Sequence, residues 1–300
     1  MLQWSMTRSP STTRGATLVA LAALLWSSSG LFIKVLPLSA LQIAFARSLV
    51  AALTIAAVVK LRGGRPFPRP DLLSLACAVS YVGVLVFFVA ATKLTTAANA
   101  IFLQFSAPIY LVFLEPWVTG RAVHGRDLAA VGLCLGAMGL FFLGRLGAGT
   151  LSGNLLGVAT GLCLALFSLT LKLQRQRRPE VDPIGAIILG NLLVAVLCAP
   201  VALRGFRLTP VHAGILLYLG IFQIGIAYLL FNAGMRHLTA TAAVVTGTLE
   251  AVLNPVWVFL GVGERPSSWA LLGGLLILGT ITWYSLSGRE PHPELPLTGA

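Results

Sequence analysis

Residues 71–92 read DLLSLACAVSYVGVLVFFVAAT, and the only charged side chain in this stretch is Asp71, at its start. A helix that crosses a bilayer needs about 20 mostly apolar residues. The stretch meets that requirement of length and composition. It therefore predicts a membrane-spanning helix, and the rest of the chain can be searched for segments of the same kind.

Such segments fill almost the whole chain. Of its 300 residues, 57% are hydrophobic and 10% charged, with a mean hydropathy of +0.90, which is outside the range of soluble globular domains. Division at the polar breaks predicts ten spanning helices, at residues 16–36, 40–60, 71–92, 96–118, 127–144, 153–173, 183–203, 211–233, 239–261 and 267–287. The predicted fold class is an all-α integral membrane protein without a soluble domain.

The basic residues predict the orientation of these helices. Alternate breaks on one side, together with both tails, hold fourteen Lys and Arg residues, whereas the opposite breaks hold six. By the positive-inside rule, both termini are expected on the cytoplasmic side of a bacterial-type cell membrane. The net charge of +12 comes from residues in the breaks rather than along one helix face, so nucleic acid is not a predicted partner.

Landmarks of the first half of the chain recur in the second half in the same order. The matching pairs are Lys34 with Lys172, Arg47 with Asn191, Leu94-Thr95 with Leu238-Thr239, and Pro108 with Pro255. Chance alignment of helices rich in Leu, Ala and Gly is the alternative explanation. A duplicated unit of five helices must enter the membrane from the opposite side in its second copy, which predicts an inverted repeat. The predicted units are an N-terminal tail 1–15, repeats 16–145 and 153–287, and a C-terminal tail 288–300.

Short motifs in these helices match those of a known family. The motifs are Leu25-Trp26-Ser27-Ser28-Ser29 with Phe32 and Lys34, Arg47 with Ala51 and Ala52, Thr95 to Ala100 continuing to Ala107-Pro108, Leu249-Glu250-Ala251 with Pro255, Gly263-Glu264-Arg265, and Gly273-Gly274 with Leu278-Gly279. In this order they resemble the EamA family of the drug/metabolite transporter superfamily. The resemblance implies a ten-helix basket around a central cavity and the export of amino acids or related metabolites.

Two charged residues lie deep within predicted helices. Glu250 is about ten residues from either end of segment 239–261, and Arg47 is about two turns inside segment 40–60. A charge at a helix centre costs on the order of 3 kcal/mol by insertion scales, so such residues usually face protein or a water-filled path. We expect Arg47 and Glu250 to face the cavity, either paired with each other or binding the charged ends of a substrate.

Uncharged polar and aromatic residues at depth complete the predicted substrate site. They are Trp26, Ser28, Tyr81, Asn99, Gln104, Gln223, Tyr228 and Asn254. Each of them can equally serve as an interhelical hydrogen-bonding or packing group. Together they indicate a mostly apolar cavity with a few polar anchors, which suits an amphipathic solute of amino-acid size.

Pro108 and Pro255 occupy matching places near the middle of the fourth helix of each half. A proline inside a helix removes a backbone donor and frees a carbonyl of the preceding turn. In a carrier such a site can act as a hinge, and a purely structural bend is the alternative.

The sequence contains no motif for catalysis or for nucleotide binding. GxSxG, HExxH and Walker A patterns are missing, and no metal or other cofactor is predicted. We therefore expect a secondary transporter that works as an exporter of a small-molecule substrate. Its expected surroundings are the lipid bilayer, and a proton or another solute is a candidate coupling partner. The alternatives are an intramembrane lipid- or isoprenoid-modifying enzyme and, within transport, a multidrug or cation exporter.

Overall fold

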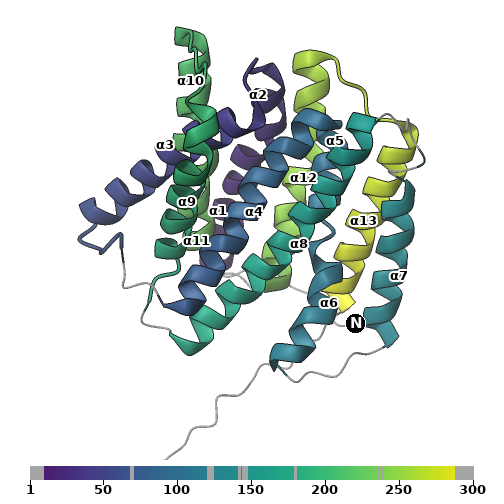
Figure 1. The fold of residues 1–300 in the computed structure, drawn as a ribbon. Coiled ribbons are helices and arrows are strands. Elements are labelled where there is room, and N and C mark those ends of the chain that lie inside the picture. The colour runs from purple at the N-terminus through teal and green to yellow at the C-terminus, as the bar shows by residue number, and fades with distance from the viewer. Residues whose placement is uncertain are drawn as a thin grey trace, which may run out of the picture.

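The computed structural model describes residues 10–67, 71–119, 125–140, 143, 148–178, 181–235, 237 and 240–287. Every regular element in these ranges is a helix (Figure 1). The helices are α1 Pro10–Ser27, α2 Ser29–Val35, α3 Ala40–Leu61, α4 Leu72–Leu94, α5 Ala97–Gln104, α6 Ala107–Thr119, α7 Gly125–Leu140, α8 Ala148–Arg177, α9 Ile184–Ala202, α10 Pro210–Tyr218, the π-helix η1 Leu219–Ile226, α11 Ala227–Gly234, α12 Ala240–Val262 and α13 Ser268–Ser287.

Each predicted span corresponds to one of these helices or to consecutive helices in line. Seven stretches of the described chain are long and apolar enough to cross a membrane, and α12 and α13 contribute the shorter apolar stretches Thr246–Val262 and Ser268–Tyr284. The predicted all-helical membrane fold is confirmed.

The first span is interrupted at three consecutive serines. α1 ends at Ser27 and α2 begins at Ser29. The hydroxyl of Ser27 donates to the carbonyl of Leu24, and that of Ser28 donates to the carbonyl of Leu25, both over 2.7 Å. Serine side chains compete in this way for backbone acceptors and weaken the helix locally.

The fourth span breaks just before its proline. α5 ends at Gln104 and α6 begins at Ala107. Proline at position 108 has no backbone N–H to donate to the carbonyl of residue 104. At the break, the neighbouring carbonyl of Leu103 accepts from both the amide and the hydroxyl of Ser106, at 3.2 and 2.6 Å. In contrast, α12 continues through Pro255, so the two matched prolines have different effects on their helices.

The eighth span contains the π-helical segment η1 between α10 and α11. Segments of this kind place an extra residue in a turn and recur at functional sites. Here η1 packs closely on α3, because a methyl group at Gly220 would lie 2.9 Å from the carbonyl oxygen of Arg47. The interruption therefore lies against α3 at Arg47 and Val50.

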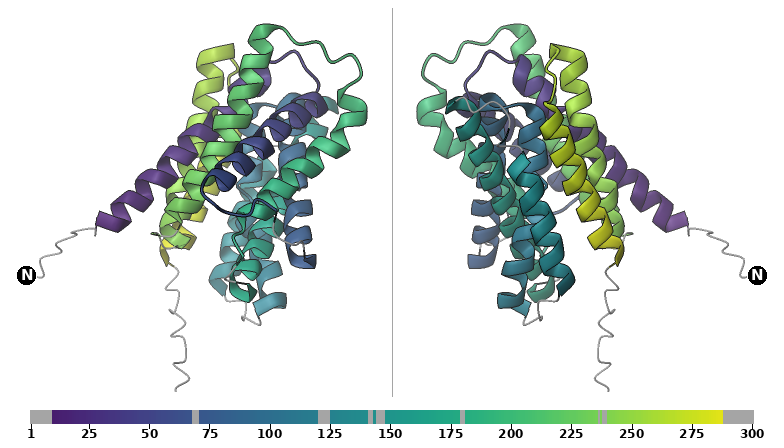
Figure 2. Two further views of the ribbon diagram at one scale, coloured as in Figure 1. Left: turned by 90° about the vertical axis from the view of Figure 1, so that its left-hand side faces the viewer. Right: turned by 90° about the vertical axis from the view of Figure 1, so that its right-hand side faces the viewer.

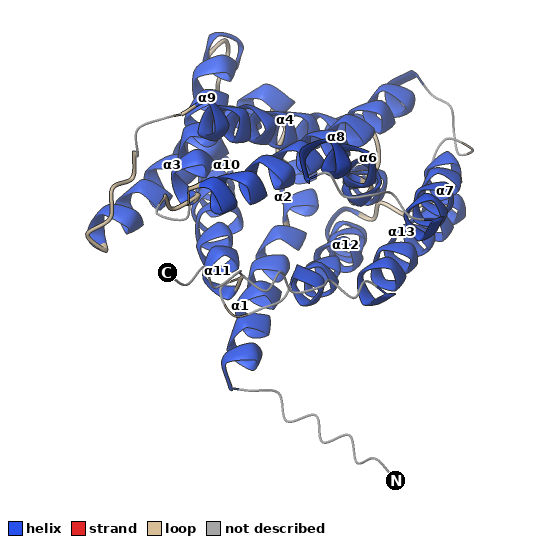
Figure 3. Ribbon diagram, turned by 90° about the horizontal axis from the view of Figure 1, so that it is seen from below, coloured by secondary structure: helices blue, strands red, loops and turns tan. Residues whose placement is uncertain are grey.

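Helix packing follows the same pattern in both halves. The third span of the first half, α4, packs on α8 and α9 of the second half. Its counterpart in the second half packs in the same way on the first half, with α11 on α1 and η1 on α3. The corresponding helices α3 and α9 pack on each other, and so do α7 and α13. Figures 1 and 3 show α4 and α8 side by side, and α7 beside α13 at one edge. Contacts between the halves thus form most of the interior.

Polar contacts identify the ends of the bundle. At one end, the Nζ atom of Lys34 in α2 donates to the carbonyl of Thr95, and Gly153 near the start of α8 also lies against Thr95. At the other end, Asp71 caps α4 by accepting from the amide of Ser74, and Arg178 after α8 lies 3.4 Å from Asp71. The first span and α8 therefore run in opposite directions, and the lower part of α1 lies apart from the other helices (Figure 2).

Candidate functional site

Three of the predicted aromatic residues meet in the interior. The ring of Tyr228 lies 5.0 Å from that of Trp26 and 5.3 Å from that of Tyr81, in edge-to-face geometry. Phe231 extends the cluster at 5.2 Å from Trp26, and Phe167 stacks on Tyr81 at 4.9 Å. We call Trp26, Tyr81, Phe167, Tyr228 and Phe231 the aromatic cluster; α1, α4, α8 and α11 contribute to it.

Close backbone approach fixes the position of Tyr81. A methyl group at Gly190 of α9 would lie 2.8 Å from the Tyr81 ring and 3.1 Å from the carbonyl of Ala78. Only a residue without a side chain leaves room for the ring at this crossing. The Tyr81 ring is consequently held between α8 and α9.

Arg47 lies against the aromatic cluster. It is 2% exposed, and its Nη2 atom donates to the carbonyl of Leu85 over 2.9 Å. Its Nε atom has no hydrogen-bond partner in the described structure. Tyr81 and Tyr228 are both close enough to interact electrostatically with its guanidinium. Arg47 is therefore buried within the helix bundle.

Glu250 approaches the cluster from α12. Its carboxylate is close enough to Tyr228 to interact electrostatically, and its side chain is partly accessible. Among the ion pairs between described residues, none joins Glu250 to Arg47. The two charges are therefore near a common tyrosine but separate from each other.

The two predicted glutamines lie at helix interruptions. Gln223 belongs to η1, is 6% exposed, and has an unpartnered Oε1 atom. Gln104 is the last residue of α5, directly before the break in the fourth span, and is 9% exposed.

Three other residues of the predicted substrate site form hydrogen bonds outside the aromatic cluster. Asn99 donates to Asn154 over 2.9 Å, in a buried network that also contains Thr95 at the end where Lys34 lies. Ser28 shares a hydrogen bond of 3.0 Å with the hydroxyl of Tyr218. Asn254 packs on the Gly30 backbone and donates to Ser29 over 3.5 Å. These contacts join helices at the serine break and at one end of the bundle, away from the aromatic cluster.

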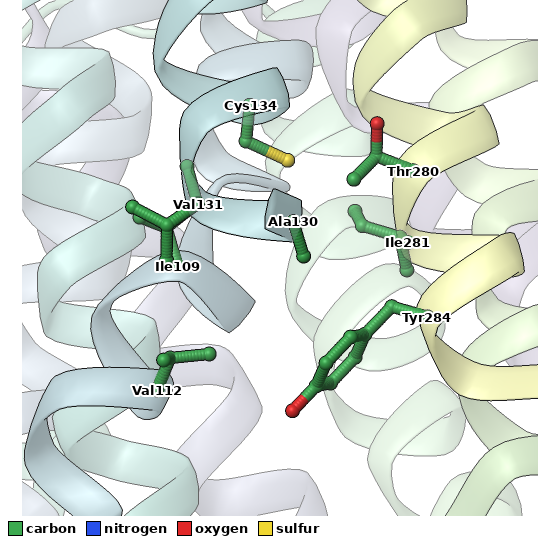
Figure 4. Close-up of a pocket in the computed structure, with 8 residues that line it drawn as sticks. All are labelled: Ile109, Val112, Ala130, Val131, Cys134, Thr280, Ile281 and Tyr284. Carbon is green, nitrogen blue, oxygen red and sulfur yellow. The ribbon is translucent and has the colours of Figure 1, made fainter. Parts of the chain in front are cut away.

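Two small pockets lie in the described structure. One lies between α6, α7 and α13 and is lined by Ile109, Val112, Ala130, Val131, Cys134, Thr280, Ile281 and Tyr284 (Figure 4). A second lies beside the aromatic cluster, lined in part by Phe167, Tyr228 and Phe231. Each has a free volume of about 20 Å³, which holds about one water molecule.

Sequence reasoning did not include Asn191, Phe167 or Phe231 in the site. Asn191 of α9 is fully buried, has an unpartnered Oδ1 atom, and lies close to the Tyr81 hydroxyl. The repeat alignment contained the signal for Asn191, because it places this residue on Arg47. No comparable signal marks the two phenylalanines, which have the composition of ordinary packing residues.

Apolar helices long enough to cross a membrane, in two half-chains that pack alike, define a polytopic membrane protein. The chain belongs to the EamA-like transporter family, which matches residues 13–144 and again residues 151–286. The resemblance read from the sequence motifs is confirmed, and with it the ten-helix repeat fold and a transport function.

Two individual proteins add to this assignment. The chain is 24% identical over 271 residues to a protein of Archaeoglobus fulgidus described as an uncharacterized transporter, covering 89% of this chain and 94% of that protein. A solved crystal structure without a functional description superposes with a TM-score of 0.66 at 19% identity, covering 95% of this chain and 100% of the other. At that identity the similarity shows the fold alone.

Proposed function

We propose that the chain is a secondary exporter that moves small amphipathic metabolites, such as amino acids, across the cytoplasmic membrane by alternating access. The observation that carries this proposal is that Arg47 is buried and Glu250 is partly accessible within the helix bundle, that both interact electrostatically with Tyr228, and that no ion pair between described residues joins them. Charges so costly to bury are retained where they serve a solute pathway.

The lining of the site suits such a solute. Aromatic faces from Trp26 and Tyr228 offer contact to an apolar body, while Arg47 and Glu250 offer opposite charges to its polar end. A bare cation would not need the arginine, and a large polyanion would be repelled by the glutamate. Family membership favours transport over the alternative of an intramembrane enzyme.

Alternating access is proposed from the repeat. We infer that the two halves form an inverted repeat whose relating axis lies in the membrane plane, with both termini in the cytoplasm. The matched packing of the halves and the opposite directions of the first span and α8 support this arrangement. The site then lies between the halves, where rocking of one half on the other exposes it to each side in turn.

The test is a flux assay with purified protein in liposomes. Radiolabelled amino acids and related metabolites are presented with and without a pH gradient, and empty liposomes provide the background. We expect saturable flux of at least one amphipathic metabolite, and stimulation by the gradient would identify proton coupling. Saturable flux of hydrophobic cations alone would instead support the multidrug alternative. A chemically modified lipid product would support the enzyme.

A further inference from the structure

The break between α1 and α2 lies between the aromatic cluster and the end of the bundle that carries Lys34. Trp26, whose ring belongs to the cluster, is close before the break, and α2 ends one residue after Lys34. Figure 1 shows α2 at the same end of the bundle as α10. With both termini in the cytoplasm, as proposed above, this is the outer end. α2 therefore lies on the outer side of the aromatic cluster.

The serines that interrupt the first span have no counterpart in the second half. Ser27 and Ser28 donate to carbonyls three residues earlier, and the first backbone bond of α2, from the Phe32 amide to the Ser28 carbonyl, is long at 3.3 Å. When Lys34 is aligned with Lys172, the three serine positions correspond to Ala165, Leu166 and Phe167. These residues lie within α8, a continuous helix of 30 residues. The interruption is therefore specific to the outer side.

Side chains of the second half hold the break in place. The indole Nε1 of Trp257 in α12 donates to the Ser27 hydroxyl over 3.0 Å. The hydroxyl of Tyr218 in α10 lies 3.0 Å from the Ser28 hydroxyl and shares a hydrogen bond with it. The break is thus a point fixed to α10 and α12, and α2 extends outward from it.

Beyond the break, α2 lies on α12 through two glycines. A methyl group at Gly30 of α2 would overlap the amide group of Asn254, and one at Gly261 of α12 would overlap the side chain of Leu31. Small residues let helices meet closely without side chains that interlock across the contact. α2 can therefore separate from α12 without moving one large side chain past another.

Polar contacts at the far end of α2 hold it closed. Lys34 lies 2.7 Å from Glu264 and donates to the carbonyl of Thr95 over 2.7 Å. Lys93 donates to the carbonyl of Leu36, directly after α2. The side chains of Lys34 and Glu264 are 19% and 22% exposed, so water reaches both. Ion pairs that water reaches are weak, and this attachment can therefore open and close.

We propose that α2 is an outer gate, which swings about the Ser27–Ser29 break and closes when Lys34 binds Glu264. The inference rests on the proposed function, because a gate acts only in a protein that moves a solute past it. α1 keeps its place against the aromatic cluster during this movement. The outer opening thus includes a bend within one span, in addition to the rocking of one half on the other, and the continuous helix α8 has no matching bend.

Two spin labels on the first span measure the bend. Leu21 in α1 and Val35 at the end of α2 are exposed, so labels at these positions disturb no internal packing. The labels are introduced into the full chain without its four native cysteines, in liposomes, and pulsed electron paramagnetic resonance gives their separation. We expect Lys34→Met to raise the population of a second distance at least about tenfold over the parent, because it removes a charged hydrogen bond.

Serine variants assign the bend to the break. Ser27→Ala with Ser28→Ala, added to Lys34→Met, removes both hydroxyl bonds to the helix backbone. It should lower the population of the second distance about fivefold, because alanine favours the helix more than serine does. Ser28→Ala alone keeps the bond of Ser27 to α12 and should act in the same direction if the double variant does not fold. Ser168→Ala removes a hydroxyl bond to the backbone within continuous α8 and should change nothing.

A further pair of labels separates bending from rigid rocking. Val35 and Ser268, the first residue of α13, report the separation of the two halves at the outer end. A single Leu21–Val35 distance in every variant overturns the gate, and growth of the Val35–Ser268 distance would then mean that the first half moves as a rigid body. A second distance that persists unchanged in the serine variants overturns the hinge. Bending as expected, in a protein without flux, retains the hinged movement and overturns the transport function.

Discussion

At the scale of single residues, the site is defined by polar groups that the apolar helices bury without fully satisfying. Arg47 uses one donor on Leu85, Tyr81 uses none, and Asn191 and Gln223 each keep an unpartnered oxygen. Buried polar groups elsewhere in the bundle are of both kinds: Asn99 and Asn154 are hydrogen-bonded to each other, whereas Asn254 Oδ1 and Gln174 Oε1 have no partner.

Glu250→Gln tests the amino-group end of the site. Because Glu250 has no ion-pair partner among the described residues, neutralisation should leave the fold intact. We expect uptake of amino acids to fall by about 10- to 100-fold, the value of one charged hydrogen bond of about 1.5–3 kcal/mol, while deaminated acids are transported as before. The double variant Arg47→Gln with Glu250→Gln should stay inactive. Recovery of both stability and flux in the double variant would mean that the two charges form a structural pair.

Gly190→Ala tests whether transport depends on the position of the Tyr81 ring against α9. The added methyl would lie 2.8 Å from the Tyr81 ring and 3.1 Å from the carbonyl of Ala78, so the ring must shift from its present position. We expect a rise in KM of about tenfold or more, as for the loss of one charged hydrogen bond. Gly136→Ala in α7 is the matched control, since an added methyl there meets no heavy atom within 4 Å. Equal flux by both variants would show that the position of Tyr81 is unimportant.

At the scale of helices, a charged contact ties three segments together at the end that we assign to the outside. Lys34 of α2 lies 2.7 Å from Glu264 in the loop between α12 and α13. The other oxygen of Glu264 accepts from the amide of Ala97 at the start of α5 over 2.7 Å, and Lys34 donates to the carbonyl of Thr95. We call this contact the outer clasp. It joins both halves, so rocking of one half on the other must break it.

Cross-linking tests whether the outer clasp opens. Lys34→Cys and Glu264→Cys are combined in a background without the four native cysteines and joined by a short reducible bifunctional reagent. We expect flux to fall to the level of empty liposomes and to return on reduction. The background protein treated with the same reagent serves as the control. Undiminished flux by the cross-linked protein would show that the clasp stays closed during transport.

At the scale of the whole molecule, the contact pattern repeats between the halves although the sequences have diverged. Trp26 meets Tyr228 between α1 and α11, as Phe167 meets Tyr81 between α8 and α4. Tyr81 and Tyr228 then meet each other at the centre. The polar groups break this symmetry, since Arg47 corresponds to Asn191, and the asymmetry gives the site a positive and a negative side.

Labelling of introduced cysteines tests the proposed topology. Arg65 follows α3, Arg177 ends α8, and Arg207 lies between α9 and α10; all three side chains are exposed. Reagents that do not cross the membrane should label positions 65 and 177 from the cytoplasm only, and position 207 from the outside only. Labelling of 65 and 207 from the same side would exclude the inverted repeat and the cytoplasmic location of both termini.

The amino-acid sequence by itself determined the ten spans and their family, because the length of an apolar segment and its short motifs are local properties. It also identified Arg47 and Glu250, because a charge inside such a segment is conspicuous. Tertiary structure alone decided that Tyr81, Arg47 and Tyr228 meet while Asn99 and Asn254 do not. Helices that are apolar on every side carry no periodic signal for the inward face, so only close packing, as at Gly190 and Gly220, sets which side chains come together.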